Sequence, residues 1–217
     1  MLKAIIFDFD YTLGDSSNGI ALSINYALEQ LGYPTRSLAE IKKTIGLSLK
    51  ETYFELTSNS DVKEAEQFSV LFKEKADQVM VDNTRLYDGV KEVLYSLKAK
   101  GYKTAIVTTK FHYRIEQILN KFDTENLIDV IVGAENVKVE KPSPEGLLWA
   151  IEQLSMNAEE VLYVGDSIVD AKTAANANVA FAATLTGATD KEAFNCHDNV
   201  YIGNNITEIY HYILSVK

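Results

Sequence analysis

An apolar run near the amino terminus ends in two aspartates. Residues 2–7 are almost all apolar, and Asp8-Phe9-Asp10 follows at once. A run of this length and continuity indicates a strand buried on both faces, although periodicity alone does not distinguish it from a short buried helix. Because open α/β folds bind their ligands beyond the carboxyl ends of the strands, we expect Asp8 and Asp10 to lie at a binding edge.

Two neighbouring carboxylates repel each other unless a cation compensates them. Mg²⁺ is the usual ion, because it takes carboxylate and carbonyl oxygens and keeps waters that a phosphate can replace. Aspartate is also common in turns, where its side chain bonds to the nearby backbone. Taken alone, the pair Asp8 and Asp10 is therefore equally consistent with a strand followed by a polar turn.

The rest of the chain contains two kinds of segment. Residues 16–83 show helical patterns throughout, with apolar spacings of three and four that suffice for a small bundle of four helices. Beyond residue 84 apolar strands alternate with helices, with strands expected at 103–108, 129–132, 161–165 and 179–185. This alternation predicts an α/β fold with a doubly wound, Rossmann-like parallel sheet. We expect a core domain of residues 1–15 and 84–217 and an inserted helical domain of residues 16–83.

Charge and composition exclude several classes of protein. Lys and Arg total 21 against 31 Asp and Glu, and the net charge of -10 argues against a nucleic-acid partner. No segment approaches 18 uninterrupted apolar residues, so we expect no membrane association. Cys196 is the only cysteine, which rules out an intrachain disulfide, and the chain begins without a basic leader. We expect a cytoplasmic protein, of undefined oligomeric state.

Polar groups also follow the other expected strands. In chain order they are Asp8 and Asp10, Thr108 with Lys110, Lys141 in Lys-Pro-Ser-Pro-Glu, and Asp166 with Ser167 and Asp170. Parallel strands present their carboxyl ends at one edge of a sheet, so we expect these groups to meet there.

These motifs together resemble the haloacid dehalogenase superfamily, specifically its phosphatases. The four ordered motifs are far more specific than any one of them, and the resemblance spans nearly the whole chain. Their separation is similar to that of members whose helical cap domain follows the first motif. The stretch Ile45-Gly46-Leu47 and the pair Thr109-Lys110 look more like phosphoglycolate phosphatases than like β-phosphoglucomutases.

The resemblance implies catalytic roles for four residues. Asp8 would be the nucleophile that forms an aspartyl-phosphate, and Asp10 would be the general acid and base. Thr108 would donate its hydroxyl to a phosphoryl oxygen, and Lys141 would hold Asp8 and the transferring group by charge. Tyr11 stands where the family often has glycine, so the loop backbone around it is expected to differ.

The resemblance also implies a Mg²⁺ cofactor and a set of ligands. Asp8, the backbone carbonyl of Asp10 and Asp166 would contact the ion, with Asp170 contacting it directly or through water. Further substrate contacts are expected from Thr109 and Lys110, and from Lys50 in the cap. Exposed lysines are, however, usually only solvated.

The function implied is Mg²⁺-dependent hydrolysis of small phosphomonoesters, with phosphoglycolate as the leading candidate. The alternatives are a sugar-phosphate mutase of the β-phosphoglucomutase kind, a pyrophosphatase and a nucleotidase. Because fold alone does not fix function, a protein that keeps the fold but only binds a phosphorylated ligand is a further reading. It is the least favoured one, because Asp8, Asp10, Lys141 and Asp166 are all present.

Overall fold

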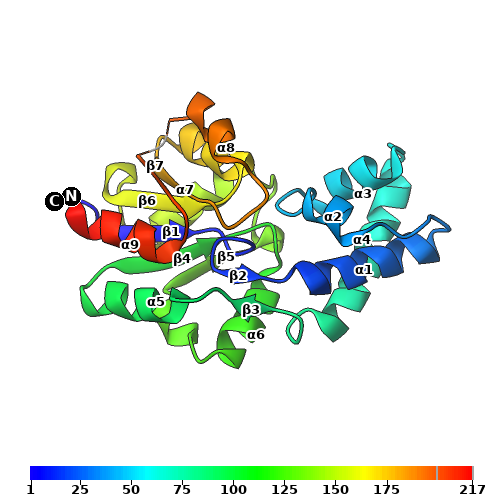
Figure 1. Cartoon of the computed structure of the whole chain (residues 1–217), viewed down its shortest axis with the longest axis horizontal. Coiled ribbons are helices and arrows are strands. Elements are labelled where there is room, and N and C mark those ends of the chain that lie inside the picture. The colour runs from blue at the N-terminus through cyan, green and yellow to red at the C-terminus, as the bar shows by residue number, and fades with distance from the viewer. Residues whose placement is uncertain (199, 217) are drawn as a thin grey trace. The chain divides into compact units, whose positions relative to one another are not determined.

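The computed structural model describes residues 1–198 and 200–216 (Figure 1). The chain divides into two compact units, one of Met1–Gly14 with Leu86–Lys217 and the other of Asp15–Arg85. Within the described ranges, no helix is long and apolar enough to span a bilayer.

The first unit is built on a parallel sheet. Its strands are β1 (Ala4–Phe7), β4 (Lys103–Val107), β5 (Val130–Val132), β6 (Val161–Gly165), β7 (Ala180–Thr184) and β8 (Tyr201–Gly203), in the order β5-β4-β1-β6-β7-β8. The strand pairs are parallel, and Ile6 of β1 lies between Ala105 and Tyr163. The chain winds outward in both directions from β1, which confirms the predicted doubly wound sheet. Of the six strands in this sheet, β8 alone was not expected from the sequence.

Helices cover both faces of this sheet, which explains why its strands are apolar on both sides. They are α5 (Val90–Ala99), α6 (His112–Lys121), α7 (Glu145–Gln153), α8 (Ile168–Ala177) and α9 (Ile206–Ser215). Ala4 and Ile6 belong to a core that α7 and α8 close with Leu147 and Ala174. All four residues of β1 are fully buried. Figure 1 shows α5 and α9 together on the opposite face from α7 and α8.

The second unit is helical. It contains α1 (Ser17–Gln30), α2 (Leu38–Lys42), α3 (Leu49–Thr57) and α4 (Val62–Val79), and two short strands, β2 (Gly14–Asp15) and β3 (Arg85–Leu86), pair at its boundary. Ser37 and Ser48 begin α2 and α3 with capping boxes, so their side chains satisfy backbone N–H groups of the first turn. Tyr53 and Phe68 are fully buried in a separate apolar core.

Candidate active site

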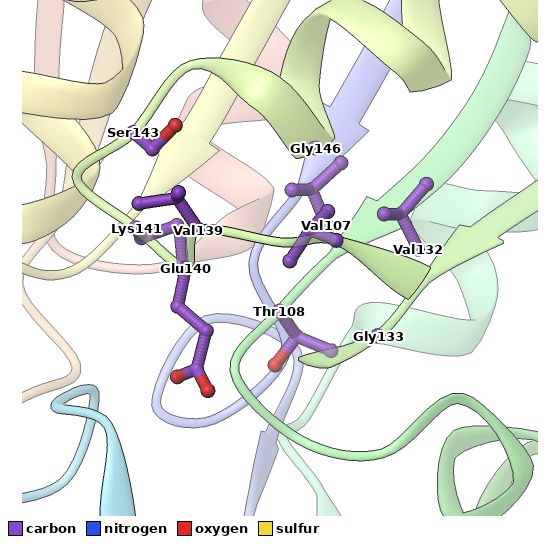
Figure 2. Close-up of a pocket in the computed structure, with 10 residues that line it drawn as sticks. Val107, Thr108, Val132, Gly133, Val139, Glu140, Lys141, Ser143 and Gly146 are labelled. Carbon is purple, nitrogen blue, oxygen red and sulfur yellow. The ribbon is translucent and has the colours of Figure 1, made fainter. Parts of the chain in front are cut away.

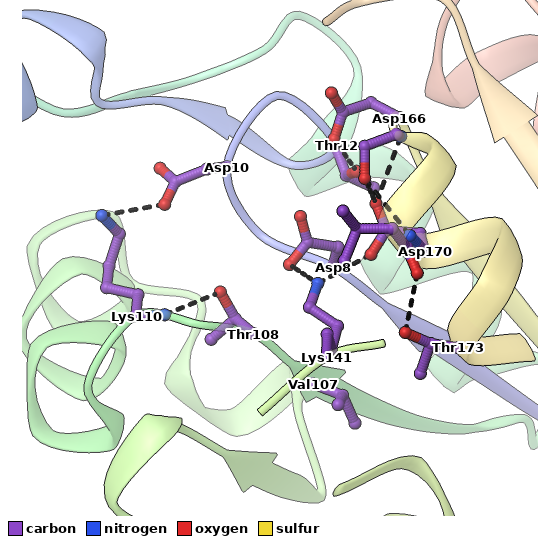
Figure 3. Close-up of polar contacts among 12 residues, drawn as sticks. Asp8, Asp10, Thr12, Val107, Thr108, Lys110, Lys141, Asp166, Asp170 and Thr173 are labelled. Carbon is purple, nitrogen blue, oxygen red and sulfur yellow. Dashed lines mark hydrogen bonds and ion pairs between the residues drawn. The ribbon is translucent and has the colours of Figure 1, made fainter. Parts of the chain in front are cut away.

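A buried lysine joins two of the predicted aspartates. Nζ of Lys141 lies 2.9 Å from Oδ1 of Asp8 and 2.7 Å from Oδ1 of Asp170 (Figure 3). Asp8 directly follows β1 and Asp170 lies in the first turn of α8. The sequence had suggested that Lys141 directly follows a strand, but it does not. The 3-10 helix η2 (Ala134–Asn136) and a further loop separate it from β5, and that loop carries its side chain back to the sheet edge.

Both carboxylate oxygens of Asp170 have protein donors. Oδ1 accepts from Lys141 and from the hydroxyl of Tyr163, 2.9 Å away. Oδ2 accepts from the backbone N–H and the hydroxyl of Ser167, at 3.2 Å and 2.5 Å, in the capping box that begins α8. Tyr163 was missed in the sequence, because a tyrosine inside an apolar strand indicates packing and gives no sign of where its hydroxyl points.

Burial and crowding of like charge dominate the electrostatics. Burial, with help from Asp170 and Asp10, raises the pKa of Asp8 to about 7 although Lys141 opposes the shift. Burial followed by Asp170 and Asp8 raises the pKa of Asp166 well above its ordinary value. Burial alone would lower the pKa of Lys141, but Asp170 and Asp8 outweigh it and raise that pKa. The site therefore holds more acidic groups than its lysine compensates.

The acidic groups are placed to hold a cation. Asp8, Asp166 and Asp170 each offer a carboxylate oxygen within 4.8 Å of the others, and all three are buried. Thr12 donates its hydroxyl to Oδ1 of Asp166 at 3.4 Å. An all-oxygen donor set with excess negative charge fits Mg²⁺ or another hard cation. The residues present therefore match the cofactor that the sequence implied.

A glycine lies against this group of acids. A Cβ atom added to Gly187, in the segment after β7, would lie 1.8 Å from Oδ2 of Asp166. In the same segment, the hydroxyl of Thr186 donates to the backbone carbonyl of Tyr11. Tyr11 has φ of 62°, in the left-handed region that glycine adopts most easily. The loop thus keeps a glycine-like conformation, and its bond to Thr186 helps to hold it.

The remaining predicted residues lie in two places. Lys110 is buried, with Nζ 2.9 Å from Oδ2 of Asp10, and its backbone N–H donates to Oγ1 of Thr108 at 3.2 Å. Thr109, between them, is half-buried. Lys50 belongs to the helical unit, where Nζ lies 5.6 Å from the ring centroid of Phe54, so its contact with a substrate stays a prediction.

A small pocket lies beside Thr108 and Lys141. Its lining includes the polar residues Thr108, Glu140 and Ser143, and aliphatic groups make up most of the remainder (Figure 2). The aliphatic lining residues are Val107, Val132, Val137 and Val139. Lys141 itself is among the lining residues, so the pocket adjoins the candidate site.

Comparisons with known proteins agree with the site. Residues 5–184 match the family described as haloacid dehalogenase-like hydrolase. A phosphoglycolate phosphatase of Colwellia psychrerythraea is 32% identical over 184 residues, which are 82% of this chain and 81% of that protein. The pyrophosphatase PpaX of Bacillus mycoides is 30% identical over 196 residues, 89% of each chain. A crystal structure described as a haloacid dehalogenase-like hydrolase of Bacteroides fragilis has a TM-score of 0.93 and 38% identity, covering 96% of this chain and 100% of that one. The chain therefore belongs to the haloacid dehalogenase-like hydrolase family, as its four ordered motifs predicted.

Proposed function

We propose that this hydrolase is a Mg²⁺-dependent phosphatase of small phosphomonoesters that works through an aspartyl-phosphate on Asp8. The observation that carries the proposal is the buried contact of Lys141 with Asp8, 2.9 Å long, beside a group of three acids able to hold a cation. Relatives named as phosphoglycolate phosphatases support it.

The first half-reaction transfers the phosphoryl group to Asp8. Lys141 holds Oδ1 of Asp8, which leaves the other carboxylate oxygen to form a bond to phosphorus while the bond from phosphorus to the ester oxygen breaks. Asp10 gives a proton to the departing oxygen, which leaves as an alcohol. Lys141 and Thr108 stabilise the negative charge on the phosphoryl oxygens.

The second half-reaction releases phosphate. Asp10 takes a proton from water, the water oxygen bonds to phosphorus, and the bond to Asp8 breaks. Mg²⁺, held by Asp8, Asp166 and the Asp10 carbonyl, would offset the charge of nucleophile and substrate. Since both oxygens of Asp170 have donors, Asp170 would reach the ion through water or by giving up a donor.

We further propose that residues 16–83 act as a cap that selects the substrate, since they are inserted directly after the first motif. Phosphoglycolate is the leading candidate. Pyrophosphate is the second, because a pyrophosphatase is also among the relatives. A cytoplasmic location is part of the proposal, since small phosphate esters are metabolites of that compartment. Initial rates on a panel of natural phosphate esters and pyrophosphate would rank these candidates.

The direct test is to trap the phosphoenzyme. Brief reaction with ³²P-labelled substrate followed by acid quenching should label wild-type protein at Asp8, and Asp8→Asn should fold but show neither label nor turnover. Asp129→Asn is a matched control, because Asp129 pairs with Lys98 at the start of β5, away from this edge. Near wild-type turnover by Asp8→Asn would exclude the mechanism.

A further inference from the structure

The side chain of Lys110 is buried in an ion pair. Nζ lies 2.9 Å from Oδ2 of Asp10, and the Lys110 and Asp10 side chains are only 4% and 11% exposed. Figure 3 shows them extending toward each other from the loops after β4 and β1. A pair this shielded is weakly screened by salt, and removal of one partner leaves the other charge uncompensated. The contact therefore constrains where the Asp10 carboxylate lies.

The backbone of the Asp10 loop is already fixed without this contact. The backbone N–H of Tyr11 donates to the carbonyl of Gly14 at 2.7 Å, and that of Leu13 donates to the carbonyl of Phe9 at 2.9 Å. A fixed backbone still leaves the two side-chain torsions of an aspartate free to choose among rotamers. The direction of the Asp10 carboxylate thus depends on its side-chain contacts, and Lys110 makes a short one.

The backbone of Lys110 is itself held in place by hydrogen bonds to neighbouring residues. Its backbone N–H donates to Oγ1 of Thr108 at 3.2 Å, and its carbonyl accepts from the N–H of Ala134 at 3.1 Å. Thr108 continues from β4, and its own N–H donates to the carbonyl of Val132 at 3.0 Å. One residue therefore contacts Thr108 through its backbone and Asp10 through its side chain.

We infer that Lys110 is a positioning residue that aims Asp10 at the ester oxygen, and that it does not bind the substrate. This inference rests on the proposed function, in which Asp10 protonates the oxygen whose bond to phosphorus breaks as Asp8 bonds to phosphorus. Loss of Lys110 should slow that step only where the leaving oxygen needs a proton. A lysine that bound substrate would instead change KM, whatever the leaving group.

Two aryl phosphates separate these roles. Phenol is as basic as a tyrosine side chain, with a pKa of about 10, and needs a proton to leave, whereas 2,4-dinitrophenolate leaves without one. Single-turnover rates of phenol and dinitrophenolate release should be compared in wild type, Lys110→Met and Lys110→Arg. Lys110→Met should release phenol about a hundredfold more slowly. Its dinitrophenolate release and both KM values should stay near wild type, and Lys110→Arg should recover most of the loss.

Lys98→Met is the matched control, because it removes another Lys–Asp pair in the same unit, 2.6 Å long, at the opposite ends of the strands. It should leave both rates unchanged. Equal losses on the two esters, or a rise in KM alone, would overturn the positioning role but leave the phosphatase proposal intact. A wild-type enzyme that releases neither product would contradict the phosphatase proposal instead.

Crystal structures of the same variants test the inference without activity. The Asp10 carboxylate should move in Lys110→Met and keep its place in Lys110→Arg. An unmoved Asp10 in Lys110→Met would also overturn the inference.

Discussion

The hydroxyl of Tyr163 donates to Oδ1 of Asp170 at 2.9 Å and accepts from Nζ of Lys141 at 3.2 Å. An ammonium group has three N–H donors, and Lys141 contacts three acceptors, Asp8, Asp170 and Tyr163. A phosphoryl oxygen can therefore receive an N–H of Lys141 only by exchange. Tyr163 is the uncharged acceptor and the most distant one, so we expect it to be the partner that is replaced.

Replacing Tyr163 with phenylalanine should destabilise the core unit by about 1–3 kcal/mol, because Lys141 loses an acceptor and Asp170 loses a donor in a buried site. Urea unfolding followed by the fluorescence of Trp149, the only tryptophan, measures this change. Tyr201→Phe is the control, since the ring of Tyr201 stacks on Tyr212 and that contact survives. Equal losses in both variants would show that the Tyr163 hydroxyl has no special role.

Replacing Gly187 with alanine should weaken Mg²⁺ binding and leave the fold intact. The new Cβ would lie 1.8 Å from Oδ2 of Asp166, so that carboxylate must turn away. Loss of the outer-shell groups that orient a metal ligand typically costs about 10–100-fold in affinity, and we expect a loss of that order here. Isothermal titration with Mg²⁺ measures the loss. Gly19→Ala is the control: it also creates a close contact, 2.9 Å from the Met80 sulfur in the helical unit, and should not change the affinity.

Much of this architecture follows from residue patterns. The continuous apolarity of residues 4–7 requires cover on both faces of the sheet, and the strand and helix alternation then orders the motifs along one edge. Contacts between individual side chains do not follow from such patterns. Neither the pairing of Lys110 with Asp10 nor the reach of Tyr163 to Asp170 leaves a periodic signal, because each depends on the positions of loops distant in sequence.

The role of Gly187 and the path of the loop before Lys141 could not be predicted from the sequence either. Gly187 lies against Asp166 only because the segment after β7 folds back over the site, and its sequence resembles any polar turn. Lys141 was predicted as a site residue. The rule that site residues directly follow strands does not predict its position, however, because η2 and a loop separate it from β5. Patterns predict which edge is functional, whereas the partners at that edge need coordinates.

Removal of Mg²⁺ should stop turnover reversibly. Without the ion, the three acids Asp8, Asp166 and Asp170 carry more negative charge than Lys141 compensates, and this excess repels an anionic substrate. Dialysis against a chelator followed by stepwise return of Mg²⁺ should abolish and restore phosphate release. Ca²⁺ should substitute poorly, because its coordination shell is larger and looser. Full activity after exhaustive chelation would reject the metal assignment.

The stability of the metal-free protein should fall as pH rises from about 4 to 7. Burial raises the pKa of Asp8 from 3.8 to about 7, so in this window the native state binds a proton that the unfolded state has released. Stability therefore declines with pH until Asp8 ionises in the native state.

Mg²⁺ favours the ionised carboxylates, so its stabilising effect should be larger at pH 8 than at pH 6. Trp149 fluorescence during urea unfolding, with and without Mg²⁺ at both pH values, measures this effect. Asp8→Asn should make the decline with pH in the metal-free protein less steep, because an amide does not titrate, and Asp166, whose pKa is also raised, should keep part of it. Urea unfolding of the metal-free wild type is also followed at pH values from 4 to 7, and stability that rose across this range would show that burial does not raise the pKa of Asp8.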